Sequence, residues 1–168
     1  MSNLIPNGFI SVEGDSATLT FKRCLDHPIE DVWTAITDPK ERADWFGATV
    51  IDSGVGGTIE TVAEGPPVSR EQRTITGRIL VWDPPNVFEH EWNQPLVEKG
   101  VVRYELAQDG KGTIVTFTHR GLSVPNAQGY ISGTHAFLDR LTAHLDGTDL
   151  PNWQQRFVEV QQTYYSEK

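Results

Sequence analysis

Short runs of strand-forming residues, separated by compact turns, recur along most of this chain and constrain its fold more than any other feature. We predict strands over residues 17–25, 59–62, 73–82, 86–92, 101–106 and 113–119, where alternating, β-branched and aromatic residues predominate. The separators carry turn chemistry, such as Asp83-Pro84-Pro85 and the Asp-Gly-Lys-Gly sequence of residues 109–112. Because parallel strands need long crossover connections, these short turns predict an antiparallel sheet, here of six or seven strands.

The periodicity changes after about residue 122, and the new pattern predicts one long amphipathic helix. Its stripe has spacings of three and four residues and consists of Tyr130, Thr134, Phe137, Leu138, Leu141 and Leu145. We expect the helix to begin between residues 125 and 133 and to end before Gly147. About twenty residues of helix span ~30 Å, which is enough to cross a whole sheet. Gly129 and Gly133 lie inside the pattern, so either the helix begins late or the glycines let something pack closely.

Three further segments carry helical signals. Pro28 with the acidic residues that follow it suits one helix start, and Asp38-Pro39 suits a second, shorter helix. The segment 151–165 has one apolar stripe, made of Trp153, Phe157, Val160 and Tyr164. This stripe predicts a tail helix that docks on its own domain or on a second copy. The sequence therefore leaves a homodimer as an alternative.

The order of these elements is strand, two helices, a run of strands and a long helix. Helices gathered on one face of an antiparallel sheet define an α+β fold. We treat residues 1–168 as one domain with a core over about 17–147 and an extra helix over about 151–165.

Composition restricts the compartment and the classes of partner. The formal net charge is −9, from 23 acidic residues against 14 Lys and Arg, and the basic residues are scattered. A phosphate backbone requires clustered cations, so we expect no nucleic acid. The single cysteine, Cys24, cannot form an intramolecular disulfide, and neither a signal peptide nor a membrane-spanning run is visible. We therefore expect a cytoplasmic protein without a membrane partner.

Several motifs together resemble one protein family. They are residues 28–39 (Pro-Ile-Glu-Asp-Val-Trp-Thr-Ala-Ile-Thr-Asp-Pro), 43–47 (Ala-Asp-Trp-Phe-Gly), 77–92, with its Pro-Pro turn, and 112–122. Together they resemble the activator of heat-shock-protein-90 ATPase homologue family of the START-like (SRPBCC, birch-pollen-allergen-like) superfamily. The resemblance implies a helix-grip fold, in which a curved sheet wraps a long helix and leaves a cavity between them. It implies no shared catalytic residues. The sequence departs from the family at Gly133-Thr134-His135, where relatives often have Gly-Trp.

Alternation along the strands gathers aromatic and polar side chains on the sheet face expected to meet the long helix. With the helix residues, the predicted ligand-binding cavity comprises Phe88, His90, Trp92, Val102, Tyr104, Phe117, His119, Tyr130, Thr134 and Phe137. A one-residue slip in register would invert this assignment, and a plain packed core would have the same composition. No pair of histidines has the spacing of a helical zinc site, so we expect no metal and no cofactor.

Three functions fit these observations. The first is the binding of a small apolar or aromatic molecule in the cavity, without catalysis. The second is a cyclase-like or hydrolase-like enzyme that uses His90 or His119 as an acid–base group, although no paired acid and base is visible. The third is a co-chaperone-like protein-interaction module, which only the family name suggests. We assign no catalytic residue.

Overall fold

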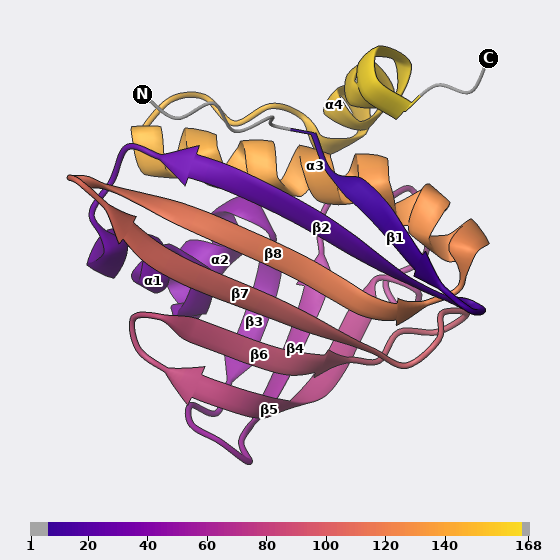
Figure 1. Cartoon of the computed structure of the whole chain (residues 1–168), viewed down its shortest axis with the longest axis horizontal. Helices are drawn as coiled ribbons and strands as arrows, with labels where there is room; N and C mark the ends of the chain where they lie inside the picture. Colours follow the sequence, from indigo (N-terminus) through magenta and orange to yellow (C-terminus); the bar gives the residue numbers. More distant parts are fainter. Residues whose placement is uncertain (1–6, 166–168) are drawn as a thin grey trace.

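Eight antiparallel strands form one strongly curved sheet that wraps around a long helix (Figure 1). The computed structural model describes residues 7–165. The strand order is β1-β2-β8-β7-β6-β5-β4-β3, and every neighbouring pair is antiparallel. The strands are β1 (Phe9–Glu13), β2 (Ser16–Leu25), β3 (Gly47–Ile51), β4 (Thr58–Ala63), β5 (Thr74–Asp83), β6 (Val87–Trp92), β7 (Gly100–Asp109) and β8 (Gly112–Leu122).

The predicted α+β helix-grip fold class is confirmed, and the sheet has two strands beyond the six ranges predicted from the sequence. Those two, β1 and β3, are the edge strands of the sheet. Most side chains of β1 are exposed, so its sequence lacks the alternation that reveals a half-buried strand. The five-residue β3 directly follows the helix α2 (Pro39–Trp45) with no turn sequence between them, so no separator marks where it begins.

The helices are α1 (Ile29–Thr37), α2 (Pro39–Trp45), α3 (Val124–Asp146) and α4 (Trp153–Val160), followed by a π-helical turn (Gln161–Tyr165). The carboxylate of Asp38 accepts a hydrogen bond from the Lys40 amide and caps α2, as its sequence predicted. The long helix begins at Val124, just before the predicted interval, because Ser123 caps it by accepting from the Asn126 amide. It ends at Gly147, whose φ of 71° places it in the left-handed region.

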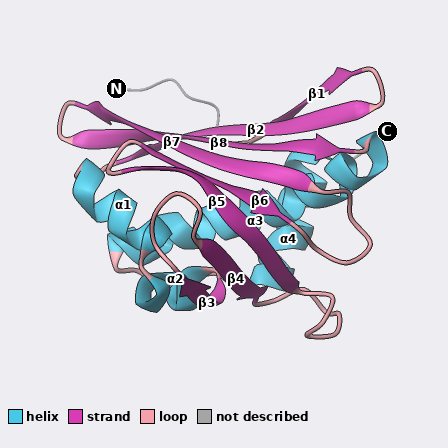
Figure 2. Ribbon diagram, turned by 90° about the horizontal axis from the view of Figure 1, so that it is seen from below, coloured by secondary structure: helices cyan, strands magenta, loops and turns pink. Residues whose placement is uncertain are grey.

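The helices all lie on the concave side of the sheet (Figure 2). The long helix α3 crosses this side, α1 and α2 lie near one end of it, and α4 packs on α3. The core between these layers includes Leu19, Phe21, Phe88, Val102 and Leu141, each at most 1% exposed. None of the helices between residues 7 and 165 is long and apolar enough to cross a membrane.

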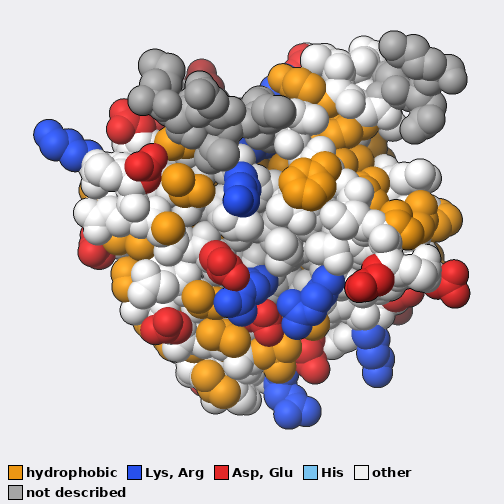
Figure 3. Space-filling model, in the orientation of Figure 1, with side chains coloured by type: hydrophobic (Ala, Val, Ile, Leu, Met, Phe, Trp, Pro, Cys, Tyr) orange, Lys and Arg blue, Asp and Glu red, His pale blue; other side chains and the backbone are white. Residues whose placement is uncertain are grey.

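The convex face of the sheet carries acidic and basic side chains next to one another (Figure 3). The carboxylate of Glu89 on β6 accepts hydrogen bonds from Arg103 at 2.9 Å and from Arg120 at 3.4 Å. Desolvation would raise the pKa of Glu89, but the hydrogen bonds from these two guanidinium groups outweigh it and leave the pKa lowered. Glu89 is therefore engaged in cross-strand ion pairs with both arginines.

The tail helix lies on α3 of the same chain, and its last turn differs from the predicted stripe. Val160 is fully buried, and Trp153 and Phe157 face α3, as their spacing suggested. Tyr164 is 42% exposed, whereas the hydroxyl of Tyr165 bonds to the Gly8 amide and to His135 Nδ1, both at 2.8 Å. The π-helical turn causes this difference, because its wider repeat brings the fifth residue after Val160, rather than the fourth, onto the buried side.

Candidate ligand cavity

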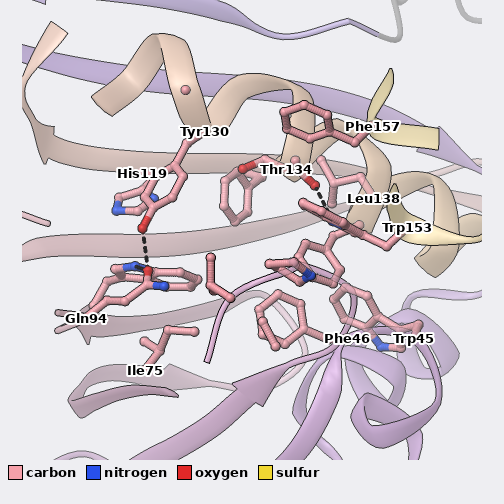
Figure 4. A pocket seen from close by; sticks show the side chains of 18 of the residues that line it. Trp45, Phe46, Ile75, Gln94, His119, Tyr130, Thr134, Leu138, Trp153 and Phe157 are labelled. Carbon is pink, nitrogen blue, oxygen red and sulfur yellow. Dashed lines mark hydrogen bonds between the residues drawn. The ribbon is translucent and has the colours of Figure 1, made fainter. Parts of the chain in front are cut away.

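A cavity of about 270 Å³ lies between the concave face of the sheet and α3 (Figure 4). Nine of its nineteen lining residues are Phe, Tyr or Trp, and none is Lys, Arg, Asp or Glu. The strands β4 to β8 form one wall, α3 forms the opposite wall, and residues from α2 and α4 close the sides. The volume is near the lower limit of ~300 Å³ for ligand pockets, so a small molecule fits.

Seven of the ten residues expected at the cavity line it. They are Trp92, Tyr104, Phe117, His119, Tyr130, Thr134 and Phe137. The register needed for this holds, because Phe88 pairs with Tyr104 and Tyr104 pairs with Phe117 across three adjacent strands.

Phe88, His90 and Val102 share the same sheet face but do not line the cavity. All three are at most 1% exposed, and His90 packs on the ring of Phe88 at 5.1 Å. The guanidinium of Arg42 from α2 is also buried on this side, close to His90 and Tyr104. Because α2 and its arginine fill this part of the concave face, His90 belongs to the core, and His119 is the histidine at the cavity.

The sequence did not reveal the lining residues that come from the ends of elements. Trp45 ends α2 and Phe46 follows it; the indole of Trp45 donates to the Ala35 carbonyl at 2.8 Å. Arg140 of α3 donates to the Trp45 carbonyl at 3.0 Å, which holds α2 against α3. The remaining unpredicted lining residues are Ala63, Pro66, Val68, Ile75, Gln94, Gly129, Gly133, Leu138, Trp153 and Phe157. For four of them the sequence did carry a signal: Gly129 and Gly133 interrupt the helix pattern, and Trp153 and Phe157 belong to the tail stripe.

Gln94 organises the polar end of the cavity. Its side-chain oxygen accepts hydrogen bonds from the Trp92 indole at 3.0 Å and from the Tyr130 hydroxyl (Figure 4). Its side-chain nitrogen donates to the Gln72 carbonyl at 2.8 Å. These bonds connect β6 to α3. They also satisfy the Trp92 indole and the Tyr130 hydroxyl with a protein partner.

His119 lies beside this network and is kept neutral by its surroundings. Its ring stacks on Tyr130 with centroids 5.7 Å apart and lies 5.0 Å from the ring of Trp92. Its Nε2 is buried and has no hydrogen-bond partner among residues 7–165. Desolvation, with a smaller contribution from His90, lowers the pKa of His119 to about 3. A neutral imidazole in this apolar wall can form a hydrogen bond but is a weak base.

The tail helix closes the opposite side of the cavity. Trp153 packs against Phe137 and Phe157, with ring centroids 5.6 and 5.2 Å away. Its indole nitrogen donates to the Gly133 carbonyl at 3.1 Å (Figure 4). A Cβ on Gly133 would lie 2.9 Å from the Trp153 ring, so this glycine permits the close approach anticipated for the helix.

The two helix glycines allow a matched test of this packing. We expect Gly129→Ala to raise the free energy of unfolding by about 0.5–1 kcal/mol, because alanine favours the helix and a Cβ there meets nothing within 4 Å. Gly133→Ala should be at least ~1 kcal/mol less stable than Gly129→Ala, because the new methyl group collides with Trp153. Urea denaturation measures both, and equal effects would mean that Trp153 does not pack here.

The described residues that line the cavity include no set typical of a metal site or of paired acid–base catalysis. Within residues 7–165, no group of three or more His, Cys, Asp or Glu side chains could hold a metal ion. His119 is the single lining residue with a side chain that ordinarily titrates near neutral pH, and no carboxylate lines the cavity with it. The arrangement is suited to enclosing an apolar molecule.

Comparison with protein families matches residues 26–146 to the family described as activator of Hsp90 ATPase homolog 1-like protein. No curated protein matches the sequence.

Solved structures resemble the chain over most of its length. CalU16 from Micromonospora echinospora is 21% identical, with a TM-score of 0.72, over 94% of this chain and 92% of that chain. A Bordetella parapertussis protein is 23% identical, with a TM-score of 0.72, over 100% of this chain and 94% of that chain. A Mesorhizobium loti protein is 23% identical, with a TM-score of 0.68, over 79% of this chain and 99% of that chain. At these identities the likeness establishes a common fold.

Proposed function

The chain belongs to the activator of Hsp90 ATPase homolog 1-like protein family, and within that family we propose that it binds one small, largely apolar molecule in the cavity under α3 without converting it chemically. The observation that carries this proposal is the aromatic cavity itself, which persists between two otherwise closely packed layers. Natural cores are packed to high density with few voids larger than a water molecule. A space of about 270 Å³ lined by nine aromatic residues is therefore better suited to a ligand than to simple packing.

The enzymatic alternative has less support. An acid–base group works best when its pKa lies near the working pH, whereas burial holds the pKa of His119 at about 3 and that of His90 at about 4. His90 also has its Nδ1 engaged with the Glu91 carbonyl at 2.8 Å and lies outside the cavity wall. Among residues 7–165, neither histidine has a hydrogen bond to a carboxylate that would activate it.

Binding can be tested with a neutral fluorescent probe, N-phenyl-1-naphthylamine. We expect the wild-type protein to bind the probe and Thr134→Phe to weaken binding at least tenfold, because the larger ring would occupy the cavity. Gln128→Phe is the matched control, since residue 128 lies on the exposed side of the same helix. Native mass spectrometry of freshly purified protein complements the titration by detecting a retained molecule.

Equal probe binding by wild type and Thr134→Phe would place the probe outside the cavity and contradict the proposal. Circular dichroism and urea denaturation of both variants distinguish a filled cavity from a protein that has failed to fold.

A further inference from the structure

The polar groups that line the cavity differ in whether the protein already engages them. The indoles of the three lining tryptophans and the Tyr130 hydroxyl each donate a hydrogen bond to a protein acceptor. The Tyr104 hydroxyl interacts with the buried guanidinium of Arg42. The Thr134 hydroxyl has no hydrogen-bond partner in the described part of the chain and, unlike His119 Nε2, it is not enclosed by protein atoms. It is therefore the lining hydroxyl that is left for a ligand.

This free hydroxyl distinguishes Thr134 from the other threonines of α1 and α3. Thr34, Thr37 and Thr142 each donate to the carbonyl four residues earlier, at 2.9, 2.8 and 3.0 Å. Such a bond to the preceding turn is the usual way in which a helix threonine satisfies its hydroxyl. Thr134 makes no such bond to the Tyr130 carbonyl in the described structure. Its hydroxyl therefore keeps both its donor and its acceptor capacity.

The position of Thr134 in the helix places this hydroxyl over the cavity. Thr134 lies one turn after Tyr130 and one turn before Leu138, and all three line the cavity, with the Thr134 side chain extending toward it (Figure 4). Each helical turn advances by ~5.4 Å, so Thr134 lies near the middle of this wall. Its side chain is partly exposed, and on the sheet-facing side of α3 the open space beside it is the cavity. A molecule that fills the cavity would pass directly below the hydroxyl.

We propose that Thr134 positions the ligand through a hydrogen bond, and that the ligand is an uncharged aromatic molecule with an oxygen on its long edge. This inference rests on the proposed ligand-binding function and deepens it. A threonine hydroxyl can donate to a carbonyl and can donate to or accept from another hydroxyl, so both kinds of oxygen fit. The rings on either side of that oxygen would lie toward Tyr130 and toward Trp153, which border opposite ends of the cavity (Figure 4).

The charge of the wall argues for an uncharged ligand. None of the lining residues is a Lys or Arg that could neutralise an anion, and none is an Asp or Glu that could pair with a cation. The buried Arg42 is not part of the wall; its guanidinium donates to the Ile36 carbonyl at 3.0 Å and lies 4.9 Å from the Phe46 ring centre. An ionised ligand would therefore lose its hydration without gaining a direct ion pair.

Three probes with one ring system test the inference: naphthalene, 1-naphthol and 1-naphthoate. Isothermal titration calorimetry on the full chain measures the ratio of the naphthalene Kd to the 1-naphthol Kd. We expect Thr134→Val, which keeps the shape and removes the hydroxyl, to lower this ratio at least about threefold, the effect of losing one hydrogen bond. A variant that merely loosened the fold would weaken both probes together and leave the ratio unchanged. We also expect wild type to bind 1-naphthoate at least about tenfold more weakly than 1-naphthol.

Thr142→Val is the matched control, because Thr142 lies on the same helix outside the cavity wall and its hydroxyl is already bonded to the Leu138 carbonyl. Thr142→Val and Thr134→Ser, which keeps the hydroxyl, should both retain the wild-type ratio. A fall of less than about threefold in Thr134→Val would overturn the role of Thr134, and tighter binding of 1-naphthoate than of 1-naphthol would overturn the uncharged class. In both cases binding itself would stand. If none of the probes binds while the protein is folded, the proposed function fails together with this inference.

Discussion

Removing residues 151–168 is expected to lower the free energy of unfolding by roughly 3 kcal/mol or more, because the tail helix supplies part of the core. Val160 is fully buried, and Trp153 and Phe157 pack on α3. Each buried apolar side chain contributes ~1.5–3 kcal/mol before the cost of ordering the tail is subtracted. The truncation also removes Arg156, which donates to Asp139 at 2.7 Å. Urea denaturation measures the loss.

Solution mass, measured on the same truncated chain, separates docking within one chain from a homodimer. Lower stability at constant mass is expected if the tail serves its own domain, whereas loss of a dimer would reveal an interface. Phe157→Ala and Val158→Ala are matched single changes, because Val158 is 44% exposed on the same helix. The first should cost ~2 kcal/mol or more and the second less than ~0.5 kcal/mol. An unchanged unfolding midpoint after truncation would contradict the docking.

The truncation should also weaken probe binding, since Trp153 and Phe157 line the cavity. Both residues lie beyond residue 146, where the match to the family ends. The tail therefore adds part of the cavity wall outside the segment that matches the family.

Much of the fold was predictable because local periodicity and packing agree. Alternation along β6, β7 and β8 places Trp92, Tyr104 and Phe117 on the concave face, and the 3.6-residue period of α3 turns Phe137 toward them. The helix ends were predictable from Asp38 and Gly147, whose side-chain and backbone properties suit those ends.

The site was less predictable where it depends on contacts between distant segments. Alternation places His90 and His119 on one face, but it cannot show which of them reaches the cavity. That depends on α2, which brings Arg42 near His90 and outside the cavity wall. Trp45 and Phe46 reach the cavity because Arg140, about a hundred residues later, holds the end of α2. Pro66 and Val68 come from a connection without regular periodicity. Such positions follow from tertiary packing, which a single sequence pattern does not encode.

His90 and His119 alone should make stability fall by about 5 kcal/mol between pH 7.5 and pH 4.5. Burial lowers the pKa of His90 to about 4 and that of His119 to about 3, against ~6.5 in an unfolded chain. Below pH 6.5 the unfolded chain therefore binds two protons that the native protein does not, and each costs about 1.4 kcal/mol per pH unit. His135, whose pKa burial lowers to about 4, adds to the same trend. Most of the interval lies above the ordinary pKa of carboxylic acids, so the histidines account for most of the fall, and glutamates begin to contribute only near pH 4.5.

Urea denaturation at four pH values across this interval measures the slope, and one substitution assigns part of it. His119→Phe should reduce the slope by about 1.4 kcal/mol per pH unit between pH 6 and pH 4.5, because one proton no longer distinguishes the two states. Tyr130→Phe is the control: burial raises the pKa of Tyr130 to about 12, so its loss removes a polar group from the same end of the cavity without a titration in this range. A flat stability profile in the wild-type protein would mean that these imidazoles can take up protons in the folded state. The exclusion of water from the side of the cavity that His119 lines, on which the proposal of a largely apolar ligand partly depends, would then be contradicted.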